Sequence, residues 1–235
     1  MSDLIDLNRY IGILAEYFPN VVEFQSDLVK AFKETIVMVS ISGSLSLFLG
    51  LFAGVFLVVT APGGLYESKW VNSIVSKTIN IFRSIPFVIL VAFMVPFTRL
   101  ITGTSIGLRG AVPPLVIGIV PFISRVVEQA LYEVDKGVIE AAMSMGISKP
   151  YIIVHILIRE ALPGIVRALV ISFISLIGLS TMAGAVGGGG VGSFAIRYGY
   201  ARYMTDVTAV TVLILLLMVN ALQGLGNIVA KKLTH

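Results

Sequence analysis

Residues 36–60 read IVMVSISGSLSLFLGLFAGVFLVVT, a stretch without a single Asp, Glu, Lys or Arg. At about 1.5 Å per residue, a helix of this length crosses the roughly 30 Å apolar core of a bilayer. The preceding residues 1–34 hold six acidic and three basic side chains, whereas the leader of a signal peptide is basic. The stretch is therefore predicted to be a first membrane span that is retained.

The composition of the whole chain is also strongly apolar. Of its 235 residues, 57% are hydrophobic and only 13% are charged, against about 25% charged residues in soluble domains. One water-surrounded core of this size cannot bury so much apolar surface, so an all-α integral membrane protein is predicted. The net charge of +4 comes without a run of basic residues, which argues against a nucleic-acid partner. The chain has no cysteine, and its two histidines, His155 and His235, are too isolated to predict a metal site.

Four further uncharged stretches complete a predicted set of five spans. Two of them lie between arginines and reach only about 22 Å as helices, which is sufficient if the arginines extend toward the membrane surfaces. Residues 1–30 are predicted to form an external or interfacial segment, and residues 31–235 a transmembrane domain. The five spans are expected at about residues 36–60, 84–101, 110–124, 166–186 and 207–229.

The distribution of Lys and Arg predicts the orientation of these spans. The segments at 61–83 and 125–167, together with the C-terminal tail, hold ten basic residues, and the opposite side holds seven. The protein is expected in the cytoplasmic membrane. Because basic residues favour the cytoplasmic side of a membrane, the N-terminus is expected outside the cell and the C-terminus inside.

A cytoplasmic loop is predicted at residues 125–164, and its sequence is not that of a flexible linker. Four apolar residues recur there at i, i+3, i+4 and i+7, as on one face of a helix: Val138, Ala141, Ala142 and Met145. Gly146 is placed to end that helix in a left-handed conformation. A second helix is expected to begin at Lys149-Pro150 and to break at residues 162–164. On periodicity alone, the first helix could equally pack beneath its own bundle.

The same loop resembles the cytoplasmic signature of permease subunits of bacterial ABC importers. The resemblance lies in Glu140-Ala141-Ala142, Gly146 and Ile156-Leu157-Ile158, although Arg159 stands where the family pattern has proline. It implies a coupling helix between spans 3 and 4 that docks into a groove of an ATPase subunit. The implied coupling residues are Val138, Glu140, Ala141, Ala142, Met145 and Gly146.

Other segments are similar to the permeases of methionine importers, namely residues 160–164, the glycine-rich run at 182–192 and Tyr198-Gly199-Tyr200. This similarity implies the type I ABC importer architecture, with a homodimer of five-helix subunits in the lipid bilayer. It also implies two cytoplasmic ATPase subunits that bind ATP and Mg, and an extracytoplasmic methionine-binding lipoprotein. The chain itself is then no enzyme and binds no cofactor.

The glycine-rich run also satisfies G-x-G-x-x-G, but no predicted strand precedes it and no Walker A lysine follows it. Nucleotide binding is therefore not expected, and close helix packing through Gly50 with Gly54 and Gly184 with Gly188 is. A further hypothesis is that this run lines or gates a translocation path, with the Met182 thioether as a soft surface for a thioether substrate. Met182 could equally be ordinary core. The candidate gate residues are Ser180, Met182, Gly184, Gly187, Gly188, Gly189 and Gly190.

Two alternative functions stay open from the sequence, a non-transporting membrane scaffold subunit and an importer of a different amino acid. An ion-coupled carrier is less favoured, because such carriers usually need charged groups at depth and the apolar centres of the predicted spans have none. The leading hypothesis is a permease that imports methionine, D and L, by alternating access driven by the partner ATPase.

Overall fold

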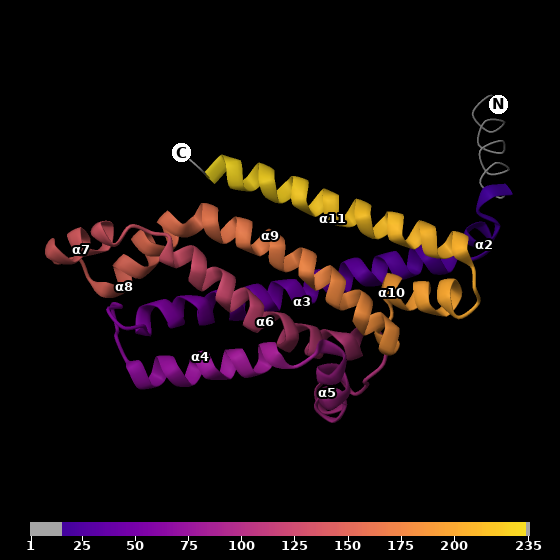
Figure 1. The fold of residues 1–235 in the computed structure, drawn as a ribbon, viewed down its shortest axis with the longest axis horizontal. Helices are drawn as coiled ribbons and strands as arrows, with labels where there is room; N and C mark the ends of the chain where they lie inside the picture. The colour runs from indigo at the N-terminus through magenta and orange to yellow at the C-terminus, as the bar shows by residue number, and fades with distance from the viewer. Residues whose placement is uncertain (1–15, 234–235) are drawn as a thin grey trace.

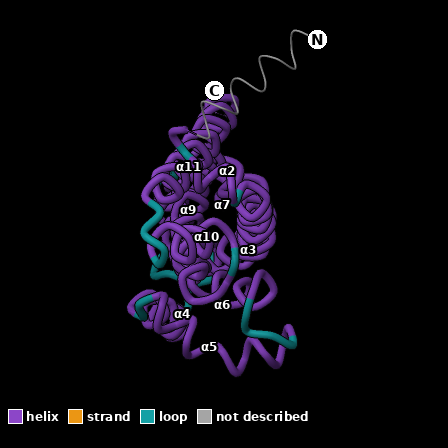
Figure 2. Tube along the Cα trace, turned by 90° about the vertical axis from the view of Figure 1, so that its right-hand side faces the viewer, coloured by secondary structure: helices purple, strands orange, loops and turns teal. Residues whose placement is uncertain are grey.

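In the computed structural model of the chain, residues 16–233 are described, and their regular structure is entirely helical. Four long helices run along the long axis of the molecule (Figure 1): α3 (Gln25–Thr60), α6 (Gly107–Tyr132), α9 (Ile158–Ala183) and α11 (Thr205–Leu233). The short helix α2 (Pro19–Glu23) precedes them. Figure 2, which views the molecule along the bundle, shows α11 at one edge and α4 and α5 at the opposite edge.

Helix α6 supplies most of the core. Leu115, Ile119, Ile123 and Val127 recur every four residues along it, and each is at most 2% exposed. Gly50 and Gly54 of α3 face this row, and a Cβ on them would lie 2.6 Å from Ile123 Cβ and 2.7 Å from Val127 Cγ1. The predicted packing role of this glycine pair is therefore confirmed, because any side chain there would push α3 away from α6.

The second predicted span, at about residues 84–101, corresponds to the second arm of a bent pair of helices. Helix α4 (Lys69–Ser84) and helix α5 (Phe87–Thr102) meet at an angle of 106°. The break falls at Ile85-Pro86, where proline restricts the residue before it to extended backbone, and Ile85 has φ −80° and ψ 122°. By length and composition, four of the described helices could cross a membrane, or five if α4 and α5 together form one span.

The helices also extend beyond the charge-free stretches. Helix α3 begins at Gln25 rather than near residue 36, so residues 25–30 of the predicted external segment belong to the first long helix. Residues 1–15 of that segment lie outside the described part of the chain. Helix α6 contains both Arg109 and Arg125, which were expected to flank its span. A run of uncharged residues underestimates a helix whose charged ends are held by partners in the same chain.

The segment predicted as a cytoplasmic loop, residues 125–164, is largely helical in the structure. After α7 (Lys136–Ser144), the chain is helical from residue 149 onward, through α8 (Lys149–Tyr151), the π-helical η1 (Ile152–Leu157) and then α9. The expected break at residues 162–164 is wrong, because Pro163 lies inside α9. A helix packed in a bundle tolerates proline where neighbours or local adjustments satisfy the freed carbonyl.

The opposite end of the molecule, here called the α10 end, closes with short elements between α9 and α11: η2 (Gly184–Gly188), α10 (Gly190–Phe194) and η3 (Ala195–Tyr200). Tyr198 packs there against Phe24 and Phe194, and its hydroxyl donates a hydrogen bond to Asp27 at 2.6 Å. This hydrogen bond to a carboxylate raises the pKa of Tyr198. The end that carries α7 is called the α7 end below.

Candidate functional site: the α7 surface and the glycine segment

Helix α7 has well-defined ends. The Asp135 carboxylate accepts a hydrogen bond of 2.8 Å from the Gly137 N–H, as an N-cap does. At the other end Gly146 has φ +75°, and the Gly146 and Ile147 N–H groups donate to the carbonyls of Met143 and Ala142. These two bonds form a Schellman motif, so the predicted helix end at Gly146 is confirmed.

The four residues that were expected to form one apolar face of α7 divide between two surroundings. Ala142 is 2% exposed and packs with Leu65, from the turn after α3, and with Ile152 of η1. Val138 is 41% exposed and Met145 71%, while Glu140, Ala141 and Gly146 are exposed as well. Ala142 therefore anchors α7 to its own chain, and the other predicted coupling residues are free to contact another molecule.

A cavity of about 450 Å³ lies beside α7, between the turn after α3 and the end of α6. Its lining includes the small residues Gly63 and Gly64, the charged Glu140 and Lys149, and Met143. The Lys149 ammonium group lies 5.1 Å from the centre of the Tyr66 ring, in a cation–π contact. The exposed side of α7 thus continues into a concave surface with both charged and apolar groups.

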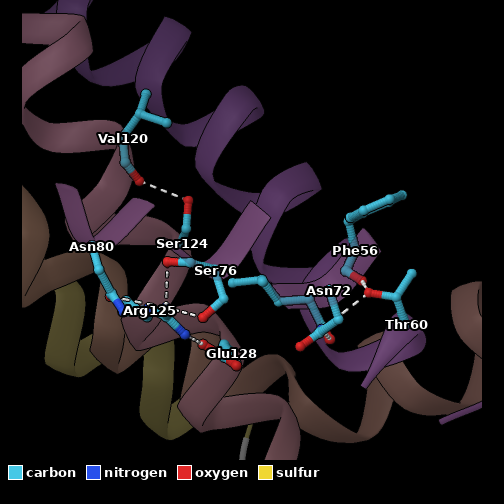
Figure 3. A network of polar contacts seen from close by, with 10 residues as sticks. Phe56, Thr60, Asn72, Ser76, Asn80, Val120, Ser124, Arg125 and Glu128 are labelled. Carbon is cyan, nitrogen blue, oxygen red and sulfur yellow. Dashed lines mark hydrogen bonds and ion pairs between the residues drawn. The ribbon is translucent and has the colours of Figure 1, made fainter. Parts of the chain in front are cut away.

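A polar network joins α4 to the C-terminal half of α6 (Figure 3). The Arg125 guanidinium bonds Glu128 at 2.7 Å, the Ser76 hydroxyl at 2.6 Å and the Asn80 amide oxygen at 2.9 Å. The Arg125 and Glu128 side chains are only 20% and 15% exposed. The sequence interpretation placed Arg125 in a loop and missed this network. The available signals were the i, i+3 pair of opposite charges and the polar residues Asn72, Ser76 and Asn80 at every fourth position.

The glycine segment, residues 184–192, is tied to α3. The Gly190 N–H donates to the Glu34 carboxylate at 2.9 Å, and the Val191 N–H donates to the Thr35 hydroxyl at 2.8 Å. A Cβ on Gly184 would lie 2.5 Å from the Ser193 nitrogen. Gly184 and Gly188 therefore permit a tight reversal of the chain within the subunit, which differs from the helix-to-helix contact expected for this pair.

The predicted gate residues are not brought together on one surface. Ser180 is 3% exposed and donates to the Ile177 carbonyl at 2.7 Å, and Gly184, Gly188 and Gly190 are buried. Gly187 and Gly189 are half-buried with positive φ angles of 95° and 83°. Met182 is 43% exposed, so it is the member of the predicted set whose side chain is most available to a substrate.

Comparison with known proteins supports the family resemblance. The chain is 42% identical over 208 residues to the probable D-methionine transport system permease protein MetI of Vibrio cholerae, covering 88% of this chain and 92% of that protein. It is 42% identical over 214 residues to the methionine import system permease protein MetP of Bacillus subtilis, covering 91% and 96%.

Structural comparison agrees. A chain of the MetNI methionine ABC transporter, solved in inward-facing conformations, superposes with a TM-score of 0.89 at 43% sequence identity, covering 91% of this chain and 99% of that one. The sequence profile of the family described as "Binding-protein-dependent transport system inner membrane component" matches residues 46–235. The chain therefore belongs to this family of inner membrane components, and its resemblance to methionine importer permeases is confirmed.

Proposed function

We propose that two copies of this chain form the translocation pathway of an ATP-driven importer for methionine, D and L. The similarity to methionine permeases over about nine tenths of the chain supports the substrate. ATP and Mg bind to separate ATPase subunits, and an extracytoplasmic methionine-binding lipoprotein delivers the substrate. A dimer is physically reasonable, because a few helices from one subunit are too few to enclose a gated path, and a two-fold interface closes it.

The observation that carries the proposal is the outward-facing side of α7. Ala142 fixes the helix to the bundle, while Glu140, Ala141 and Met145 project from it with no partner that buries them in the described chain. A small residue such as Ala141 lets a partner backbone approach closely, and an apolar Met145 beside a charged Glu140 is typical of a docking surface with a polar rim. This surface contacts the ATPase subunit.

The α7 end then lies in the cytoplasm, with the C-terminus, and the α10 end lies outside. This assignment agrees with the larger number of basic residues in the segments around α7. ATP binding draws the two ATPase subunits together, and each moves the α7 helix bound to it. Because α7 continues through η1 into α9, and because Arg125 links α6 to α4, the motion reaches the long helices as a rigid-body rotation of each half.

The test is uptake of labelled methionine into vesicles that contain the purified permease, its ATPase and the binding protein. We expect ATP-dependent uptake by the wild type. Glu140→Lys should abolish uptake while leaving the amount of folded permease in the membrane unchanged, because Glu140 is exposed.

Ser148→Lys, an exposed substitution in the turn beyond α7, is the matched control and should transport normally. Normal uptake by Glu140→Lys would contradict the docking role of α7. Wild-type vesicles that accumulate another amino acid but not methionine would preserve the mechanism and change the substrate, whereas uptake of neither would favour a scaffold subunit.

A further inference from the structure

Arg83 lies on the surface of the bundle, beside the middle of α6. It belongs to the last turn of α4, and it lines a cavity together with Gly118 and Phe122 of α6. These two residues lie near the middle of α6, which runs from residue 107 to 132. The start of α5 packs closely against α6 at this point, because a Cβ on Gly118 would lie 3.0 Å from the Phe87 ring just after the bend. The sequence interpretation had placed Arg83 in a loop outside the membrane.

The Arg83 side chain has no partner within residues 16–233. It forms no ion pair or hydrogen bond with any of these residues, and this includes the free carbonyls at the end of α4. It is exposed on the surface of the single chain. A cationic side chain at the middle of a membrane protein avoids lipid and faces a water-filled path, a substrate or a charged partner. Arg83 therefore needs polar surroundings that residues 16–233 of one chain do not supply.

The cavity at this bend has about 320 Å³, at the small end of the range for ligand pockets. Three aromatic rings line it, those of Phe82, Phe87 and Phe122, and Ser175 of α9 adds a hydroxyl group. The Ser175 hydroxyl donates to the Ile171 carbonyl at 3.0 Å, so the oxygen can still accept a hydrogen bond. One cation, one acceptor and an aromatic wall converge on a single small space.

We propose that this cavity holds the transported amino acid and that Arg83 binds its carboxylate. The inference rests on the proposed function and adds a substrate site to it. A guanidinium group binds a carboxylate through two parallel hydrogen bonds. The Ser175 oxygen accepts from the substrate ammonium group, and the phenyl rings surround its side chain, where contact between a thioether sulfur and an aromatic ring is favourable.

The path from this cavity toward the α10 end follows one side of α9. Ser175, Gly178 and Met182 succeed one another there at helical spacing, Gly178 and Met182 are exposed, and the space beside Gly178 is open within 4 Å of a Cβ. Met182 thus lies about two turns from Ser175 on the same side of the helix, so it borders the route by which a substrate would reach Arg83.

The experiment measures binding of labelled methionine to the assembly of permease and ATPase in lipid nanodiscs, without the binding protein. Unlabelled methionine and methionine amide, which lacks the carboxylate, serve as competitors. In the wild type, methionine should compete roughly 10- to 100-fold better than the amide, the range expected for loss of a charge-assisted hydrogen bond. Arg83→Gln should remove this preference by weakening methionine alone, and Arg83→Lys should restore part of it.

Lys77→Gln is the matched control, because Lys77 is an exposed cation on the same helix that does not line the cavity. It should bind like the wild type. If Arg83→Gln keeps the full preference for methionine over its amide, or if it separates the two permease copies in size-exclusion chromatography, Arg83 does not bind the substrate. If either result is obtained and the wild type still transports methionine in vesicles, the substrate site is wrong but the proposed function stands. If the wild type transports no methionine, the proposed function is wrong as well.

Discussion

Helix α7 and the glycine segment at residues 184–192 are both rich in small residues. In α7 some of these residues face outward, whereas in the glycine segment they pack against the same subunit. In α7, Ala141 leaves a surface that a partner can approach, and one alanine, Ala142, attaches the helix to the bundle. In the glycine segment, backbone of the same subunit occupies the space where side chains would be. Glu34 and Thr35 of α3 accept hydrogen bonds from N–H groups of the segment. Small residues therefore indicate that another group packs closely against the helix. Only the surrounding structure shows whether this group belongs to the same subunit or to a partner.

The largest expected effect is that of Gly192→Ala in the glycine segment. The new methyl group would lie 2.6 Å from Thr181 Cα and against its carbonyl, so α9 or α10 must move. Because backbone cannot be displaced cheaply, we expect a loss of about 3 kcal/mol or more and little folded protein. Thermal unfolding in detergent measures the effect. A melting temperature equal to that of the wild type would show that the glycine segment is not locked.

Ala142→Leu should destabilise the protein by about 1 to 3 kcal/mol, because Leu65 and Ile152 leave no room for three further carbon atoms. Ala141→Leu places the same atoms on the exposed side, where substitutions usually stay within about 0.5 kcal/mol. Unfolding of the two variants side by side compares the faces of one helix. Equal destabilisation would contradict the division of α7 into an anchored and a free side.

Gly146→Ala and Gly187→Ala place the same strain in the two regions. Both glycines have positive φ, of 75° and 95°, and both have open space around a Cβ. We expect a cost of about 1 kcal/mol for each, from backbone conformation alone. Chemical denaturation of the two variants measures the loss of stability in each. A much larger cost at Gly187 would mean that its surroundings in the assembly are tighter than in the single subunit.

Met182→Ala should have the smallest effect on stability, within about 0.5 kcal/mol, because the side chain is 43% exposed. Its effect should appear in transport, as slower methionine uptake at an unchanged rate of ATP hydrolysis. Leu179→Ala, one turn earlier and packed against the core, is the opposite case, with lower stability. Unchanged uptake by Met182→Ala would remove the last exposed member of the predicted gate.

Much of the fold could be predicted from local signals. The first long helix followed from residues 36–60, and the end of α7 followed from Gly146, because helical periodicity and left-handed glycine are properties of neighbouring residues. The sides of α7 could not be predicted in the same way. Ala142 is internal because Leu65 and Ile152 lie beneath it, and these residues come from segments far from α7 in the sequence or beyond its end.

The positions of the charged residues could not be predicted from local signals. Counting uncharged stretches as spans placed Arg83 and Arg125 in loops. In the structure Arg83 lies in the last turn of α4, beside Gly118 and Phe122 of α6, and Arg125 lies within α6 itself. Arg125 is compatible with the bundle because Glu128, Ser76 and Asn80 satisfy it. Arg83, by contrast, forms no ion pair or side-chain hydrogen bond with the described residues 16–233.

The claim that the free side of α7 docks an ATPase subunit can be tested directly with single cysteines, because the chain has none of its own. Ala141→Cys and Ala142→Cys are labelled with a maleimide in the membrane, with and without the ATPase subunit. Ala142→Cys should react slowly in both states, and Ala141→Cys should react rapidly in the permease alone and at least tenfold more slowly once the ATPase is bound. Equal labelling of Ala141→Cys in the two states would contradict the account.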